Sequence, residues 1–252
     1  MLTSTRVQST SQVIRSAGVT RRGRGRETNQ DVLIVESQLS LFAVLDGMGG
    51  VVGGDVAARL AADAIVSFMK ENAVAKTLQT RDLLDLAIGE AAAAVYLQSK
   101  RSEHLNGMGT TVVACVVECG RLIVGNVGDS RAYLWRRGEL LALTRDHSVV
   151  QELLDVGWLS VSEAAVSHTK NFLTRSLGLD PVVAVDLVEH ALEPGDRVLL
   201  CSDGLHDVVS GNELADVLAS RAPEHAAEQL VELALPRGTD DISAVVVAVE
   251  HA

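Results

Sequence analysis

Aspartates recur at the edges of apolar, strand-like segments, most of them beside glycine. The stretch FAVLDGMGG places Asp46 directly after an apolar run, and RVLLCSDGL repeats the arrangement with Asp203. Aspartate is depleted in strands and common in turns, so each residue taken singly is as well explained as a turn former. The aspartates at strand edges are Asp31, Asp46, Asp129, Asp203, Asp240 and Asp241.

Taken together, these carboxylates predict a metal site where several strand ends meet. Unpaired carboxylates brought together would repel one another and be costly to desolvate, and a cation removes that cost. A carboxylate-rich, all-oxygen site suits Mg²⁺ or Mn²⁺ rather than zinc. The glycines would let backbone carbonyls and waters come close to the ion, so LDGMGG is interpreted as a metal cradle.

Composition excludes several classes of protein. The chain has 252 residues, 47% of them hydrophobic, which is typical of one large globular domain. A net charge of −11 argues against nucleic acid or an anionic membrane as the main partner. No run approaches membrane-spanning length, and the N-terminus has no signal-like apolar stretch. The three cysteines, Cys115, Cys119 and Cys201, are expected to be buried, reduced thiols in a cytoplasmic protein.

The hydrophobic pattern predicts an α+β fold, with hairpins in series and helices in pairs. Such a pattern favours antiparallel sheets covered by helices over a doubly wound parallel sheet. Strands are predicted at 13–20, 31–36, 39–45, 110–117, 121–127, 131–136, 139–143, 198–201 and 243–249. Helices are predicted at 56–69, 81–100, 148–155, 211–220 and 223–235. No linker or repeat divides the chain, so residues 1–252 are expected to form a single domain.

Eight motifs, in order along nearly the whole chain, resemble those of the metal-dependent protein phosphatases of the protein phosphatase 2C (PPM) type, in its bacterial form. The motifs are RETNQD (26–31), LDGMGG (45–50), GMGTTVV (107–113), NVGDSRAYLWRRGEL (126–140), LTRDHS (143–148), LTRSLG (173–178), SDGLHDVV (202–209) and DDISAVVV (240–247). The resemblance implies a four-layer α/β/β/α sandwich of two antiparallel sheets flanked by helix pairs. It also implies a single catalytic domain that hydrolyses phosphoserine and phosphothreonine in proteins.

The resemblance also implies roles for individual residues. Asp46 matches the aspartate that bridges two metals, with the Gly47 carbonyl on the second. Two core Mn²⁺ or Mg²⁺ ions would acidify a bridging water, and the resulting hydroxide would attack phosphorus in line. Together with the arginine that grips the phosphate, they would stabilise charge on its oxygens. The other matches are Asp203 and Asp240 for the first metal, Asp31 for the second, Asp129 for a third, weaker one, and Arg26 for the phosphate.

The chain departs from the family pattern at three positions. Met48 replaces a histidine proposed elsewhere as general acid, and Gln30 stands where other members carry glutamate. Asp241 replaces an asparagine. Because neighbouring side chains of a strand point to opposite faces, we expect Asp240 to be the metal ligand and Asp241 to brace loop backbone. On this interpretation Asp241→Asn is tolerated or mildly stabilising.

Histidines and arginines outside these matches have ordinary interpretations. His147 is either a catalytic base or, as we favour, a side chain that packs against or caps the helix from Ser148. His168 follows a segment that forms a flap in relatives and is given no direct role. The remaining arginines of TRRGRGRE are expected to face solvent.

The sequence-based function is reversal of a serine/threonine protein kinase. The expected partners are phosphorylated proteins and a cognate kinase, with no nucleic acid and no membrane, and the expected state is a cytoplasmic monomer. Two alternatives stay open. One is a metal-dependent hydrolase of small phosphate esters. The other is a phosphoprotein-binding pseudophosphatase, although Asp46, Asp203 and Asp240 are all present.

Overall fold

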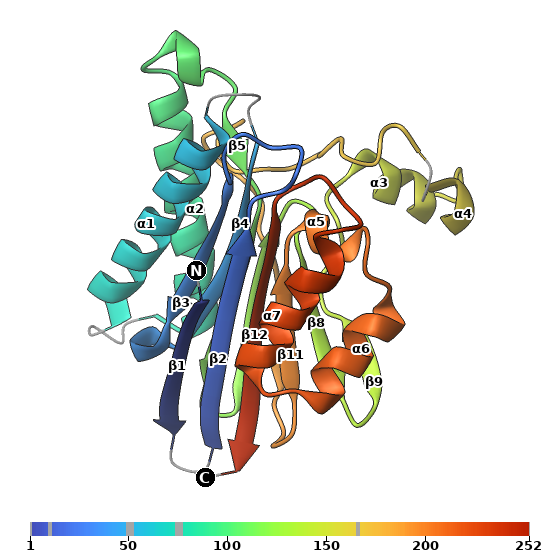
Figure 1. Cartoon of the computed structure of the whole chain (residues 1–252). Coiled ribbons are helices and arrows are strands. Elements are labelled where there is room, and N and C mark those ends of the chain that lie inside the picture. Colours follow the sequence, from blue (N-terminus) through green and yellow to red (C-terminus); the bar gives the residue numbers. More distant parts are fainter. Residues whose placement is uncertain (1, 10–11, 49–52, 74–77, 165–166, 252) are drawn as a thin grey trace.

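Two antiparallel sheets stack face to face between two layers of helices (Figure 1). The computed structural model describes residues 2–9, 12–48, 53–73, 78–164 and 167–251. The first sheet has the order β1 (Leu2–Ser9), β2 (Gln12–Arg21), β12 (Ile242–His251), β11 (Arg197–Cys201), β8 (Arg131–Arg136) and β9 (Glu139–Ala142). The second has the order β10 (Asp186–Ala191), β7 (Arg121–Val127), β6 (Val112–Glu118), β4 (Leu41–Met48) and β3 (Asp31–Glu36), and the short β5 (Gly109–Thr110) pairs with the end of β4.

Each outer face of the sandwich is covered by its own helices. The second sheet packs against α1 (Gly54–Ala73) and α2 (Thr80–Ser99), and the first against α5 (Asp203–His206), α6 (Gly211–Ser220) and α7 (Pro223–Ala234). Two further short helices, α3 (Val149–Asp155) and α4 (Val161–Ala164), project to one side at the upper end in Figure 1. Single 3₁₀ turns lie at Ser37–Leu39 and Glu103–Leu105. The four-layer sandwich predicted from the sequence is confirmed.

Side-chain alternation along β4 explains why its sequence is apolar on both faces. Leu41, Ala43 and Leu45 pack in the cluster that includes α1 and α2. Phe42 and Val44 pack in the cluster between the two sheets. Successive side chains of a strand point to opposite faces, so a strand buried on both sides reads as a continuous apolar run. The polar residues at its end are therefore exceptions that need another explanation.

Several connections at one end of the sandwich cross from one sheet to the other. Residues 22–30 join β2 of the first sheet to β3 of the second, and residues 128–130 join β7 of the second to β8 of the first. The chain also leaves β4 and β11 and enters β12 at this end. Polar residues far apart in the sequence are thus gathered at one edge of the inter-sheet core.

The sequence missed two strands and misplaced parts of two others. β1 has a polar sequence and pairs only with β2, and β10 is an edge strand whose side chains are mostly half-exposed or exposed. Neither presents the apolar pattern that marks a buried strand. The strand expected from residue 39 begins at Leu41 because Ser40 adopts a left-handed conformation, with φ 48°, after the 3₁₀ turn. The strand expected at 110–117 is divided between β5 and β6.

The expectation about the cysteines is wrong at one position. Cys115 and Cys201 are buried, as predicted, within β6 and β11. Cys119 is exposed, because it occupies the tight turn between β6 and β7 with φ 50°. None of the helices among the described residues is both long and apolar enough to cross a membrane.

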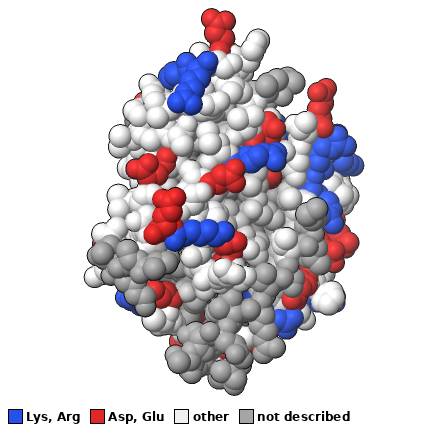
Figure 2. Space-filling view, turned by 90° about the vertical axis from the view of Figure 1, so that its left-hand side faces the viewer, with Lys and Arg blue, Asp and Glu red and all other residues white. Residues whose placement is uncertain are grey.

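Charged side chains of both signs are mixed over the face shown in Figure 2. Lysine and arginine lie close to aspartate and glutamate over the described part of this face. Neighbouring opposite charges of this kind offset one another in water and contribute little to stability. The end of the sandwich where the sheet connections cross has a different composition, because several carboxylates gather there.

Candidate active site

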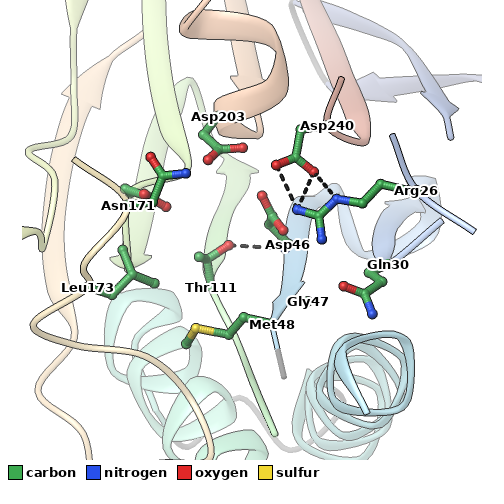
Figure 3. A pocket seen from close by; sticks show the side chains of 11 residues that line it. Arg26, Gln30, Asp46, Gly47, Met48, Thr111, Asn171, Leu173, Asp203 and Asp240 are labelled. Carbon is green, nitrogen blue, oxygen red and sulfur yellow. Dashed lines mark hydrogen bonds and ion pairs between the residues drawn. The ribbon is translucent and has the colours of Figure 1, made fainter. Parts of the chain in front are cut away.

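A cavity of about 200 Å³ opens at the end of the sandwich where the connections cross. Figure 3 shows carboxylates and an arginine on one side, and Met48 and Leu173 on the other. Of the residues predicted to form the site, the cavity collects all but Asp31. The lining residues are Arg26, Gln30, Asp46, Gly47, Met48, Thr111, Asp129, Asn171, Leu173, Asp203 and Asp240.

Strand register places Asp46 and Asp31 next to each other. Asp46 continues the series Phe42, Val44 along β4, so its side chain lies on the inter-sheet face, just beyond the apolar core. Asp31, the first residue of β3, is its direct cross-strand partner. Directly opposed residues have their side chains on the same face. Asp31 is buried behind the cavity wall, where its Oδ2 accepts a hydrogen bond of 2.8 Å from Ser202 Oγ.

The other carboxylates come from turns at the same end. Asp129 lies in the turn that carries the chain from β7 to β8, and Asp203 is the first residue of α5, two residues after β11. Asp240 lies two residues before β12. Asp46 and Asp203 point toward the centre of the cavity in Figure 3. The prediction that these strand ends meet is therefore confirmed.

Two glycines beside the carboxylates are required by close backbone packing. A Cβ on Gly47 would lie 2.1 Å from the Gly54 carbonyl oxygen. A Cβ on Gly204 would lie 2.0 Å from the Asp241 carbonyl oxygen. Both contacts are with backbone, which cannot rotate away as a side chain can. The glycines therefore allow neighbouring chain segments to close around the cavity.

Burial raises the pKa of the clustered carboxyl groups. The pKa of Asp31 rises to about 7, that of Asp129 to about 8 and that of Asp203 to about 6. The pKa of Asp46 rises well above its usual value. Removal from water is the largest cause in each case, and the negative charges of neighbouring aspartates add to it. The cluster thus resists carrying its full negative charge unless a cation is present.

The donor atoms of the cluster fit a hard divalent cation. Asp31 Oδ1 and Asp203 Oδ1 are buried and make no hydrogen bond to any described part of the chain. Every side chain proposed as a ligand offers oxygen, which Mg²⁺ and Mn²⁺ prefer. No three histidine, cysteine, aspartate or glutamate side chains among the described residues are arranged to hold one ion by themselves. This is compatible with Mg²⁺, which usually keeps several of its waters.

Arg26 and Asp240 form a bidentate ion pair at the edge of the cavity. Arg26 Nε donates to Asp240 Oδ1 at 2.7 Å, and its Nη2 donates to Oδ2 at 2.7 Å (Figure 3). These hydrogen bonds raise the pKa of Arg26, which keeps the guanidinium charged. The sequence assigned these two residues to different partners, phosphate and metal, and the structure shows that they also bind each other.

Asp241 holds the loop that carries Arg26, and its contacts argue against the expectation that asparagine is tolerated there. Asp241 is buried, and its two carboxylate oxygens accept hydrogen bonds of 2.8 Å from the backbone N–H groups of Gly23 and Gln30. The bracing role is confirmed. An asparagine, however, would turn an N–H group toward one of these N–H donors. Asparagine would relieve the repulsion between position 241 and Asp31, and we expect the loss of an acceptor to outweigh that relief.

Hydrogen bonds behind the carboxylates involve residues to which the sequence analysis gave no role. Thr111 Oγ1 accepts from the Asp46 N–H at 3.0 Å and shares a hydrogen bond of 2.8 Å with Ser130 Oγ. His206 Nε2 lies 3.0 Å from the Asp129 carbonyl oxygen, to which it can donate. Thr111 and His206 both lie within motifs that carried the family resemblance, which is the signal that could have identified them.

Of the remaining residues singled out in the sequence, two line the cavity and two do not. Met48 and Gln30 line the cavity. His147 is buried, and its Nδ1 accepts from the Gly128 N–H at 3.1 Å, while the neighbouring Ser148 caps α3, so the packing interpretation of His147 is supported. His168 is exposed and does not line the cavity.

A cavity that combines buried carboxylates with a guanidinium has the chemical groups that divalent cations and phosphate groups prefer. Comparison with known proteins identifies the class. The family model for protein phosphatase 2C matches residues 18–235. The chain therefore belongs to the protein phosphatase 2C family.

Individual relatives are similar over most of the chain. It is 38% identical over 206 residues to a serine/threonine phosphatase stp of Listeria monocytogenes, with 80% of this chain and 82% of that one covered. It is 36% identical to the serine/threonine protein phosphatase PstP of Mycobacterium tuberculosis, which covers 94% of this chain and 45% of that one. A crystal structure of the PstP catalytic domain in complex with two manganese ions has 34% identity and a TM-score of 0.85, and covers 95% and 99% of the two chains.

Asp241→Asn is expected to destabilise the protein by about 1–3 kcal/mol, because one buried N–H group loses its acceptor. The loop from Gly23 to Gln30 should loosen, which lowers the affinity of Arg26 for phosphate. Urea denaturation and the KM for a phosphopeptide measure the two effects. Asp216→Asn, at an exposed position on α6, is the matched control. Equal stability of the two variants would contradict the bracing role of Asp241.

Thr111→Val is expected to lower kcat and to cost about 1–3 kcal/mol of stability, because the Asp46 N–H and the Ser130 hydroxyl both lose a buried partner. Thr111→Ser keeps the hydroxyl and should retain most of the activity. The free energy of unfolding and kcat of the two variants are compared. If valine and serine have the same effect, the hydroxyl does not position Asp46.

The chelator-treated protein is expected to become less stable as pH rises. The folded-state pKa values of about 6 to 8 exceed the usual aspartate value of about 3.9, so the folded state holds protons that the unfolded state has lost. The stability contributed by these protons is present below about pH 4 and is lost as pH rises through 6 to 8. Thermal melts from pH 5 to pH 8.5 with and without Mn²⁺ test this. A pH dependence unaffected by Mn²⁺ would show that the cluster does not bind the cation.

Proposed function

We propose that the protein is a Mn²⁺- or Mg²⁺-dependent phosphatase that hydrolyses phosphoserine and phosphothreonine in proteins. The observation that carries the proposal is the cavity that Asp46, Asp129, Asp203 and Asp240 line together with Arg26. Membership of the protein phosphatase 2C family supports the same reaction. The PstP structure with two manganese ions supports the choice of cofactor.

The carboxylates divide into direct and supporting positions. Asp46, the Gly47 carbonyl, Asp203 and Asp240 are the proposed ligands of two core ions. Asp129 is the proposed ligand of a weaker third, and Asp31 supports the second core ion from behind the cavity wall. When bound, the cations supply Lewis-acid stabilisation of the phosphate oxygens and acidify a water.

The side chains of the chain itself bind and orient the substrate. Arg26 presents a planar set of N–H donors that matches the oxygens of a phosphate group. Phosphate binding competes with Asp240 for the same guanidinium. Met48 and Leu173 add apolar surface to the lining of the cavity beside the proposed phosphate position. The Thr111 hydroxyl accepts from the Asp46 N–H and so holds the Asp46 backbone in place. The Asp46 carboxylate stays available as a metal ligand.

The biological setting follows from the proposed reaction. A phosphatase for phosphoserine and phosphothreonine reverses the action of a serine/threonine kinase, so such a kinase is the proposed functional partner. We further propose that residues 1–252 act as one catalytic domain and that the protein is a cytoplasmic monomer. A single inter-sheet core, to which both sheets contribute, supports the one-domain interpretation.

Purified protein is expected to hydrolyse p-nitrophenyl phosphate and phosphothreonine peptides with Mn²⁺ or Mg²⁺, and EDTA should abolish turnover. Asp203→Asn should lower kcat by on the order of 10²–10³-fold, the usual effect of removing one electrostatic stabiliser. Asp180→Asn, an exposed aspartate outside the cavity, is the control. Full activity in EDTA would contradict the metal-dependent mechanism. Faster hydrolysis of nucleotides than of phosphopeptides would indicate the alternative substrate class.

A further inference from the structure

A second groove extends from the catalytic cavity beneath the two projecting helices α3 and α4. It has a volume of about 320 Å³ and shares Asp129, Asn171 and Asp203 with the cavity. The helices α3 and α4 contribute four apolar side chains to its lining, Val150, Leu154, Val161 and Ala164, beside the polar Ser148 and Gln151. A chain segment whose phosphoresidue occupies the cavity therefore has a direct path into this groove.

Local capping interactions fix the helices that carry these apolar side chains. Ser148 Oγ accepts from the Gln151 N–H at 3.3 Å and begins α3, and Gly157, with φ 72°, follows its end. Glu163 Oε2 accepts from the Ser160 N–H at 2.8 Å and from the Ser160 hydroxyl at 2.6 Å, as in a capping box at the start of α4. Positions three residues apart on a helix share a face, so Val161 and Ala164 both border the groove.

Apart from the proposed metal ligands Asp129 and Asp203, the acidic and basic side chains around the groove are paired with one another. Arg131 donates to both oxygens of Asp146, at 2.8 and 2.6 Å. Lys170 Nζ lies 2.5 Å from Asp207 Oδ2. Away from the proposed metal ligands, a charged side chain entering the groove would have to disrupt these pairs or lose its own water without compensation. An apolar side chain faces neither cost and gains contact with the apolar side chains of α3 and α4.

Val161 is the most exposed of these apolar side chains. It is 80% exposed, although β-branched apolar residues are poor helix formers and are mostly buried. Only Val182, at 82%, is more exposed among the large hydrophobic residues that the structure describes. Val182 does not border either the cavity or the groove, so the two valines differ in location and not in exposure.

We propose that the groove between α3, α4 and α5 binds one aliphatic side chain close to the phosphoresidue of the protein substrate. The proposal rests on the proposed phosphatase activity and adds to it the class of sequence that the enzyme prefers. The occupant is a neutral apolar residue because α3 and α4 present four apolar side chains to the groove, and the charged side chains away from the proposed metal ligands are paired. Continuity with the cavity places this residue within a few positions of the phosphothreonine or phosphoserine.

A set of phosphothreonine peptides tests the proposal. Leucine, alanine or aspartate is placed in turn at each of the three positions before and after the phosphothreonine, and kcat/KM is measured with Mn²⁺. Leucine at one position should raise kcat/KM about tenfold over alanine, in the range expected for filling an apolar pocket. In Val161→Asn this advantage should fall to about twofold or less, mainly through KM. Val182→Asn should keep it, and all three proteins should hydrolyse p-nitrophenyl phosphate equally.

The other outcomes each overturn a different statement. If no leucine position exceeds alanine, or if aspartate is preferred, the groove does not select an aliphatic residue. If Val161→Asn keeps the preference, or Val182→Asn loses it, the preference arises elsewhere. Loss of p-nitrophenyl phosphate hydrolysis in Val161→Asn would indicate damage to the catalytic cavity instead of the groove. Absence of p-nitrophenyl phosphate and phosphopeptide hydrolysis by the unmodified protein would overturn the proposed function, and with it this inference.

Discussion

The arrangement of this molecule depends on burying several like charges at one end of an apolar sandwich. Asp31 and Asp46 are direct cross-strand partners at the edge of the inter-sheet core, and Asp203 enters the same space from the other sheet. Stability alone disfavours such a cluster, because each carboxylate loses water and repels its neighbours. A structure that nevertheless retains it must gain from an added cation. The strand ends, turns and close-packed glycines at this end of the sandwich bring the carboxylates together.

Hydrogen bonds between side chains and backbone groups hold the segments that carry the clustered carboxylates close together. Asp241 accepts from two N–H groups of the loop that carries Arg26, and Thr111 joins the backbone of Asp46 to Ser130. These bonds cross between segments far apart in the sequence. These contacts fix the backbone of Asp46 and of the loop that carries Arg26. The position of the charges is thus set by groups that do not themselves bind the cation or the phosphate.

The sequence predicted the parts of the structure that depend on hydrophobic pattern and on motif order. Buried strands such as β7 and β8 were placed with correct bounds, because their apolar runs are bounded by glycine-containing turns. The edge strands β1 and β10 were missed, because an edge strand needs no strong apolar pattern. The hydrophobic pattern also located the carboxylates, because each one lies at or near the end of an apolar run in the sequence.

The partners of polar groups could not be predicted in this way. The sequence placed Asp241 correctly as a backbone brace, but it gave no sign that both donors are backbone N–H groups of a distant loop, which argue against asparagine there. His206 lies within a motif, yet its contact with Asp129 depends on how α5 sits against the turn between β7 and β8. Hydrogen-bond direction and close packing between distant segments become visible only in three dimensions.

The proposed catalytic residues lie on strand ends within the sandwich, whereas the proposed substrate groove is formed largely by two short helices outside it. The strand ends that carry Asp46 and Asp203 are fixed by sheet pairing and by cores on both faces. The helices α3 and α4 are short, begin at local capping interactions, and contribute only Val150 and Ala164 to the buried set. Substitutions on these helices therefore change what contacts the groove without moving the carboxylates. On this reasoning a fixed catalytic centre can serve different phosphoproteins, because the surface that selects among them is built on a separate and less constrained segment.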